Sequence, residues 1–157
     1  MVSPSRRVLG IAAVLAASVT LSGCSVIGGL LGGGNNVFTL KVGDCFNEGT
    51  LVNDEVADVP IVECSEPHLY EVTKSVILED GDYPGEDEVV GQAEDECFVA
   101  FEDYIGASWE QSGSLDYSYF VPTTETWNDA DDREILCLVV DLEGERKGSV
   151  KNAGPQS

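Results

Sequence analysis

The first candidate for chemistry among the 157 residues of this sequence is its single histidine, His68. Ser65 and Glu66 precede it closely, so a Ser–His–acid hydrolase is the first chemistry to consider. The segment lacks the strand–turn–helix nucleophile elbow that holds a catalytic serine, and one histidine is too few for most zinc sites. We therefore expect His68 to stabilise a tight turn beside Pro67, with contact to a partner as its functional alternative.

Acidic side chains are the second group that could do chemistry. They cluster in four runs, at Glu79–Asp82, Glu86–Glu88, Glu94–Glu96 and Asp129–Asp132. Carboxylates can bind calcium, but no run has the spacing of a twelve-residue EF-hand loop. Paired carboxylates can also hydrolyse glycosidic bonds, yet so many acids single out no pair. We expect a solvated acidic surface with no metal and no cofactor. The alternatives are a hydrolase that uses carboxylates or His68, and a calcium- or solute-binding module.

The net charge narrows the choice of partners. The chain has 29 Asp and Glu against 8 Lys and Arg, which gives a formal net charge of −21. Nucleic-acid binding needs a basic patch, and this composition cannot supply one. Charge alone would not hold the chain on anionic lipid either. The composition favours a basic protein partner, whose association would be sensitive to salt.

The N-terminus predicts export and lipidation. Arg6 and Arg7 precede an apolar run that is too short to span a bilayer comfortably, as in an export signal. The following Leu21-Ser22-Gly23-Cys24 resembles the lipobox of bacterial lipoproteins, in which the cysteine receives a diacylglycerol thioether and becomes the mature N-terminus. We therefore expect the acyl chains on Cys24 to anchor the protein to the extracytoplasmic face of the cell membrane.

The whole chain divides into four segments by composition. Residues 1–23 are the expected signal peptide, and residues 24–36 are the lipidated cysteine with a Gly-rich flexible linker. Residues 37–150 are the expected folded domain, and residues 151–157 read as a disordered tail. The chain therefore predicts one small domain on a lipid tether.

Four further cysteines lie in the expected domain, at Cys45, Cys64, Cys97 and Cys137. An even number in an exported domain predicts two disulfides, and the lack of a C-x-x-C pair argues against zinc. Four cysteines allow three pairings. Cys97 lies on the apolar stripe of a predicted helix, and Cys137 lies in an apolar strand on which that helix would pack. We therefore expect Cys97–Cys137 and Cys45–Cys64.

The elements that position these residues predict an α+β fold, with a small, mostly antiparallel sheet and one main helix at about 86–105. The helix carries an apolar stripe at spacings of three and four, formed by Val89, Ala93, Cys97, Ala100, Phe101 and Tyr104. Strands are predicted at 38–46, 58–64, 69–78 and 135–140, with a last short strand near Val150. In the third strand, Tyr70, Val72, Val76 and Leu78 are expected on one face. In the fourth, Ile135, Cys137 and Val139 are expected to face the helix.

The segment between helix and last strand is rich in aromatic residues and includes an expected loop at 112–118. We expect Trp127 to close one end of the core. Trp109, Tyr117 and Tyr119 are candidates for contact with a protein partner. Arg133 is expected in an internal ion pair, with a neighbour of Asp132 or with Glu125.

These landmarks together resemble a known family. They are Val42–Phe46, Val62–His68 with C-x-x-P-H, Tyr83–Gly85 before the helix, and the W-x(4)-D-R-x(3)-C pattern from Trp127 to Cys137. This set is similar to the septum formation domain of actinobacterial envelope proteins, except that Asp131 stands where glycine is expected. The resemblance implies a role in the envelope or in cell division, and it supplies no catalytic residues. We expect a non-catalytic, membrane-anchored interaction module and not an enzyme.

Overall fold

The computed structural model describes residues 35–52 and 55–156 of the chain. The predicted signal peptide, Cys24 and nearly all of the predicted linker lie outside these residues. No helix within the described ranges is long and apolar enough to cross a membrane. The described residues therefore comprise the expected domain and its immediate flanks.

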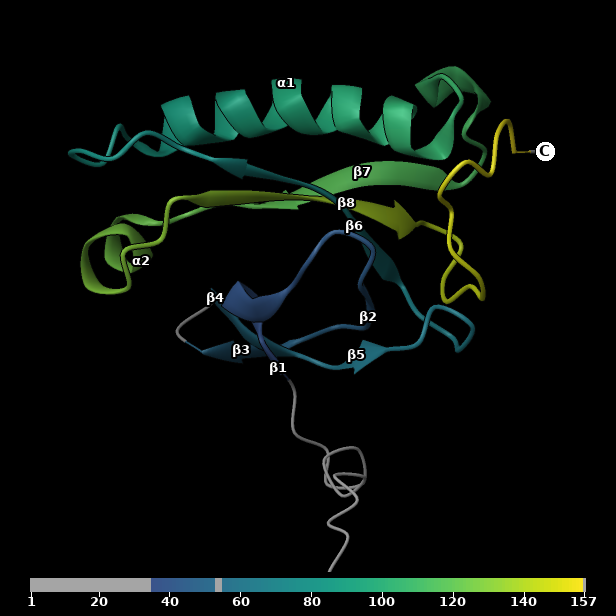
Figure 1. Cartoon of the computed structure of the whole chain (residues 1–157), viewed down its shortest axis with the longest axis horizontal. Coiled ribbons are helices and arrows are strands. Elements are labelled where there is room, and N and C mark those ends of the chain that lie inside the picture. Colours follow the sequence, from purple (N-terminus) through teal and green to yellow (C-terminus); the bar gives the residue numbers. More distant parts are fainter. Residues whose placement is uncertain (1–34, 53–54, 157) are drawn as a thin grey trace, which may run out of the picture. The chain divides into compact units, whose positions relative to one another are not determined.

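Two antiparallel sheets and one long helix make up the domain (Figure 1). The larger sheet has five strands in the order β5 (Ile61–Val62), β2 (Cys45–Phe46), β6 (Tyr70–Ile77), β8 (Glu134–Asp141) and β7 (Leu115–Phe120). The smaller sheet has three strands in the order β1 (Asn35–Asn36), β4 (Glu55–Val59) and β3 (Thr50–Val52). The helices are α1 (Glu86–Ile105) and α2 (Thr124–Asp129), with short 3₁₀ turns η1 (Val37–Thr39) and η2 (Trp109–Gln111). The predicted α+β class is confirmed.

The main helix α1 has the predicted bounds. Acidic residues in its first turn interact favourably with the helix dipole. Gly106 ends the helix in the left-handed conformation, with φ 74°, and its N–H donates to the carbonyl of Glu102 at 2.9 Å. All six residues of the predicted apolar stripe are buried, and the helix packs on β6, β7 and β8. The 3.6-residue period was therefore sufficient to place this element.

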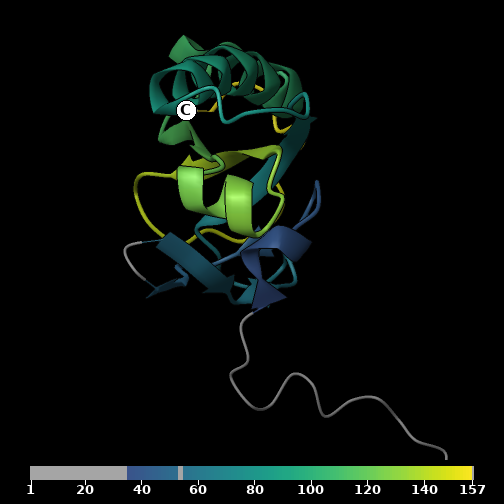
Figure 2. The same cartoon turned by 90° about the vertical axis from the view of Figure 1, so that its left-hand side faces the viewer.

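The two faces of β8 lie in different parts of the core. Ile135 and Cys137 pack under the first half of α1, and Val139 packs under its second half. Leu136 and Leu138 pack on the opposite face, against η1, β2 and the end of β4. Figure 2 shows α1 on one side of the central strands of the larger sheet and the smaller sheet on the other. The predicted alternation of β8 is confirmed, and β8 is covered on both faces.

A β-bulge in β6 corrects the predicted faces of that strand. The residues expected on one face are Tyr70, Val72, Val76 and Leu78. The register with β8 shifts between Val72 and Lys74, which leaves Thr73 as an extra residue and reverses the alternation. Tyr70 and Val72 pack away from α1, whereas Val76 and Leu78 pack towards it. Lys74 consequently lies on the helix side, where its Nζ pairs with Glu96 of α1 at 2.7 Å.

Other strands also differ from prediction. Of the segment 38–46, only β2 is strand, because η1 and a turn occupy its first part. The segment 58–64 is divided by Pro60, which has no N–H for a ladder, between β4 and β5. The expected loop at 112–118 contains the first four residues of β7. No strand is present near Val150 in the described chain; an isolated bridge joins His68 to Arg146 instead.

The C-terminal segment lies against the end of α1. The backbone N–H of Asn152 donates to the carbonyl of Tyr104 at 2.8 Å, and that of Gly154 donates to Ile105 at 2.8 Å. Gln156 bonds in the same way to Gln111 of η2. Residues 151–156 therefore depart from the expectation of a disordered tail, because they satisfy carbonyls that the helix leaves free at its end.

Trp127 of α2 closes one end of the core, as expected, with 3% of its surface exposed. Its indole N–H donates to the carbonyl of Gly81 at 2.9 Å, and the guanidinium of Arg133 lies 3.8 Å from the ring centroid. Arg133 pairs with Asp131 and with Asp80, each at 3.2 Å. The predicted partner, a neighbour of Asp132, is thus confirmed. The pair is not internal, because the side chains of Asp131 and Asp80 are 91% and 92% exposed. Asp131 itself has φ 55°, which explains why glycine is expected there.

Candidate functional site

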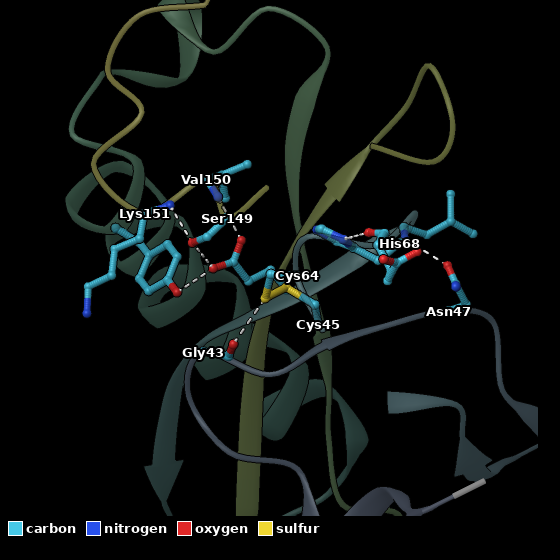
Figure 3. Close-up of a disulfide and its surroundings, with 12 residues drawn as sticks. Gly43, Cys45, Asn47, Cys64, His68, Ser149, Val150 and Lys151 are labelled. Atoms are coloured by element: carbon cyan, nitrogen blue, oxygen red, sulfur yellow. Dashed lines mark hydrogen bonds between the residues drawn. A yellow bond between two sulfur atoms is a disulfide. The ribbon is translucent and has the colours of Figure 1, made fainter. Parts of the chain in front are cut away.

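Both disulfides are formed with the predicted pairing. Cys97–Cys137 joins α1 to the central strand β8 inside the core. Cys45–Cys64 joins β2 to the turn after β5 (Figure 3). The two sulfurs of this second bridge and a carboxylate oxygen of Glu71 lie within 4.8 Å of one another. Sulfurs bonded to each other are not thiolate ligands, so this group does not form a metal site while the bridge is intact.

Glu71 is a buried carboxylate, 2% exposed, whose hydrogen bonds are all internal. One oxygen accepts the hydroxyl of Tyr104 at 2.7 Å and the hydroxyl of Ser149. The other accepts the backbone N–H of Val150 at 2.8 Å. Burial, together with the hydrogen bond to Glu71, raises the pKa of the Tyr104 hydroxyl above its ordinary value. This carboxylate therefore ties β6, α1 and the C-terminal segment together, which is a structural role.

His68 is fully buried. Its backbone N–H and carbonyl bond to Arg146, each at 2.9 Å, and its Nδ1 lies 2.8 Å from the carbonyl of Glu66. Because a carbonyl only accepts, Nδ1 carries the hydrogen. Its buried Nε2 has no hydrogen-bond partner among the described residues. Figure 3 places His68 and Asn47 on one side of the Cys45–Cys64 bridge. The bond from Nδ1 to Glu66 fits the turn interpretation, and the buried ring offers no surface to a partner in this structure.

A group of aromatic and acidic side chains at the β7 edge of the larger sheet remains accessible. We define the β7 surface as Glu94, Phe98, Glu102, Trp109, Asp116, Tyr117 and Tyr119. Trp109 is 45% exposed and Phe98 is 38% exposed, which is high for aromatic side chains. Tyr117 and Tyr119 are half-buried. Three of the four predicted interaction residues thus lie together, whereas His68 lies elsewhere.

Hydrogen bonds fix Trp109 in this surface. Its backbone N–H donates to a carboxylate oxygen of Glu102 at 2.8 Å. Its indole N–H donates to Asp116 at 2.9 Å, and the same oxygen of Asp116 accepts the N–H of Tyr117 at 2.9 Å. The indole is therefore held in place while nearly half of its surface stays in solvent. An exposed, oriented indole of this kind is typical of binding surfaces.

A ridge of α1 runs along the same edge. Glu94, Phe98 and Glu102 are four residues apart, so they follow one another on one side of the helix. The Phe98 ring packs edge-on against Tyr117 of β7, with 5.7 Å between ring centroids. Burial, and after it the nearby charge of Glu94, raises the pKa of the Tyr119 hydroxyl above its ordinary value. Each residue of the ridge therefore has a neighbour on the β7 side.

The stretch of chain that builds this surface carries charge of one sign. From Ser75 to Asp132 the sequence contains 17 Asp and Glu residues and no Lys, Arg or His. This stretch supplies α1, η2, β7 and α2. The nearest cations along the chain, Lys74 and Arg133, are paired with Glu96 and with Asp80 and Asp131. The β7 surface is thus a source of negative potential that attracts cations.

Sequence reasoning predicted a solvated acidic surface, but it missed the grouping of Glu94 and Glu102 with Phe98 and the role of Glu71. Phe98 stands outside the apolar stripe, and that misfit was the one signal that pointed to a surface aromatic. The register of β7 brings Tyr117 beside Phe98. It depends on pairing with β8, so the local sequence contains no signal for it. Glu71 reads as an ordinary polar position in an alternating strand.

Comparisons with known proteins give one result. The sequence matches the model of the family described as "Septum formation" over residues 42–156, which is most of the described domain. No curated protein and no solved structure matches the chain.

Proposed function

Because the chain belongs to the septum formation family, we propose that it is a non-catalytic, lipid-anchored interaction module that acts at the division site of the cell envelope. The observation that carries the proposal is the β7 surface, where an oriented Trp109 and half-buried tyrosines lie within a cation-free, acidic stretch. Such surfaces bind protein partners, with the aromatic groups as anchors and the charges as guides.

The anchoring part of the proposal rests on the lipobox at Leu21–Cys24. Two disulfides support an oxidising compartment outside the cytoplasm, where such bridges persist. Diacylglycerol on Cys24 would hold the protein at the membrane, because two acyl chains are sufficient for stable anchoring. The acidic domain would be repelled by anionic headgroups, so its surface would face partners in the envelope.

The non-catalytic part of the proposal is supported by the way chemistry-bearing groups are used. The hydrogen-bond donors to the Glu71 carboxylate are groups of the domain itself, and the ring of His68 is closed off from solvent. A general acid or base must reach a substrate directly or through one water. Neither group is placed to do so in this structure.

The proposal is tested by imaging a fluorescent fusion that is compatible with export, through the division cycle of the native host. We expect enrichment at the septum for the unaltered chain and loss of membrane localisation for Cys24→Ala. An even membrane signal throughout the cycle would contradict the division role. Unchanged membrane localisation of Cys24→Ala would contradict the lipid anchor.

A further inference from the structure

The free edge of β7 is the long open edge among the described strands. At the other end of the larger sheet, β5 has two residues, and the edge strands of the smaller sheet, β1 and β3, have two and three. β7 has six residues and pairs only with β8 within the described chain. Folded proteins commonly protect such an edge with lysine, proline or a bulge. Here Pro122 follows the strand, but no lysine or bulge interrupts it.

The register of β7 fixes which backbone groups point outward. The N–H of Leu142 donates to the carbonyl of Ser114 at 2.9 Å, so Ser114 is hydrogen-bonded to the β8 side. Because hydrogen-bonded and non-hydrogen-bonded pairs alternate in an antiparallel ladder, residues 116, 118 and 120 also bond to β8. Residues 115, 117 and 119 therefore direct their N–H and C=O groups to the free edge.

The first half of this edge is closed by local hydrogen bonds, and the second half is open. The N–H of Leu115 bonds to the carbonyl of Ser112, and the N–H of Tyr117 bonds to Asp116. The carbonyl of Tyr117 and both backbone groups of Tyr119 have no such partner among the described residues. They form a ready template on which an extended chain could pair.

The ridge of α1 lies beside this template. Glu94 is near Tyr119, Phe98 packs on Tyr117, and Glu102 bonds to Trp109. A chain added to the edge would lie about 4.8 Å from β7, within reach of this ridge. Alternate side chains of the added strand would point towards two carboxylates with an aromatic ring between them. Cationic side chains with long apolar stems suit both features.

The same charges disfavour a second copy of this chain as the occupant. Pairing of two β7 edges would bring two copies of the cation-free stretch together, with like charges facing each other. Such a juxtaposition opposes association. The observations therefore favour a partner of opposite charge.

We infer that the outer edge of β7, at Tyr117 to Val121, binds an extended, lysine- or arginine-rich segment of a partner protein as an added strand beneath the Glu94–Phe98–Glu102 ridge. This inference rests on the proposed function and gives it a surface and a class of partner. Main-chain hydrogen bonds would supply affinity, and the two carboxylates would select positive side chains.

The charge part is tested with the full chain and a synthetic peptide in which lysine and valine alternate. Glu94→Lys with Glu102→Lys reverses the ridge charge. Asp95→Lys with Asp103→Lys makes the same charge change at the same spacing on exposed positions of the same helix. We expect the ridge variant to weaken peptide binding by roughly tenfold or more, and the control by much less. Equal losses for the two variants would overturn the selectivity of the ridge.

The backbone part is tested at Tyr119. Tyr119→Pro removes the outward N–H, and an edge strand tolerates proline where the N–H faces solvent. Tyr119→Ala removes the same aromatic ring and keeps the N–H. We expect Tyr119→Pro to bind the peptide clearly more weakly than Tyr119→Ala, and thermal melts verify that both variants fold. Bound peptide should also slow hydrogen exchange at the Tyr119 amide of the unaltered chain.

Two results would overturn the inference. One is unchanged exchange at Tyr119 under saturating peptide. The other is self-association of the chain that the peptide does not displace and that Tyr119→Pro abolishes, because the occupant would then be a second copy. Failure of the proposed function has a different signature. The fusion would then give an even membrane signal in cells, whether or not the purified chain binds the peptide. The two failures are therefore distinguishable.

Discussion

The hydroxyl of Tyr104 donates a 2.7 Å hydrogen bond to the buried carboxylate of Glu71, which also accepts the N–H of Val150. This relationship joins residues that are 33 and 79 positions apart in the chain. It fixes the second half of α1 over the sheet and holds the C-terminal segment beside it. The position of α1, which carries the ridge of the β7 surface, thus depends on one internal carboxylate.

Glu71→Gln should destabilise the domain. The amide has one acceptor oxygen in place of two, so at least one of the three donors loses its partner. A buried donor without a partner costs about 1–3 kcal/mol, so we expect a loss of that order in the free energy of unfolding. Urea unfolding measures this loss, with the exposed Glu63→Gln as control. A loss no greater than that of the control would contradict the role assigned to Glu71.

Alkaline pH should destabilise the domain through Tyr104. Its pKa is higher in the folded chain than its ordinary value of 10.0, so folding favours the protonated hydroxyl. This contribution is complete below pH 10 and is lost as the pH rises beyond it. Tyr83 and Tyr119, whose pKa values are also raised, act in the same direction.

Tyr104→Phe separates this effect from the others. The variant should be less stable at neutral pH, because a donor to Glu71 is lost, and its stability should fall less steeply above pH 10. Unfolding measured from pH 8 to 11 at each pH gives both quantities. If the free energy of unfolding of Tyr104→Phe fell as steeply with pH as that of the unaltered chain, the other tyrosines would account for the loss of stability at alkaline pH.

Asp131 should tolerate glycine better than a β-branched residue. Its φ of 55° lies in the left-handed region, which costs roughly 1–2 kcal/mol for a residue with a Cβ. Asp131→Gly should leave the domain as stable or slightly more stable, since relief of strain offsets the greater freedom of the unfolded chain. Asp131→Val should be less stable by about 1–2 kcal/mol.

Asp131→Asn tests the exposed ion pair of the same residue. Asparagine adopts the left-handed conformation readily, so this variant removes the charge facing Arg133 and keeps the backbone. Surface pairs contribute little, and thermal melts should show almost no shift. A large loss in Asp131→Asn, comparable to that of Asp131→Val, would mean that the charge and not the backbone governs this position.

Mild reduction should open the Cys45–Cys64 bridge first. Cys45, Cys97 and Cys137 are fully buried, whereas Cys64 is half-exposed and offers a sulfur for thiol attack. Limited treatment with dithiothreitol, followed by alkylation and peptide mass mapping, should therefore label Cys45 and Cys64 before the other pair. Simultaneous labelling of all four would indicate that reduction requires global unfolding.

The sequence predicted α1 and β8 well because burial imposes a period on each. The stripe from Val89 to Tyr104 and the alternation at Ile135–Val139 are local signals, and they also led to the Cys97–Cys137 bridge. The bulge at Thr73 escaped prediction because a shift of register depends on the partner strand. The open edge of β7 escaped for the same reason, although Trp109, Tyr117 and Tyr119 were already candidates by type.

The most direct test is the septal-to-lateral fluorescence ratio of three fusions followed through division. They are the unaltered chain, the ridge variant Glu94→Lys with Glu102→Lys, and the control Asp95→Lys with Asp103→Lys. We predict septal enrichment for the unaltered chain and the control, and an even membrane signal for the ridge variant. The same ratio in all three fusions would contradict the claim that this surface holds the protein at the division site.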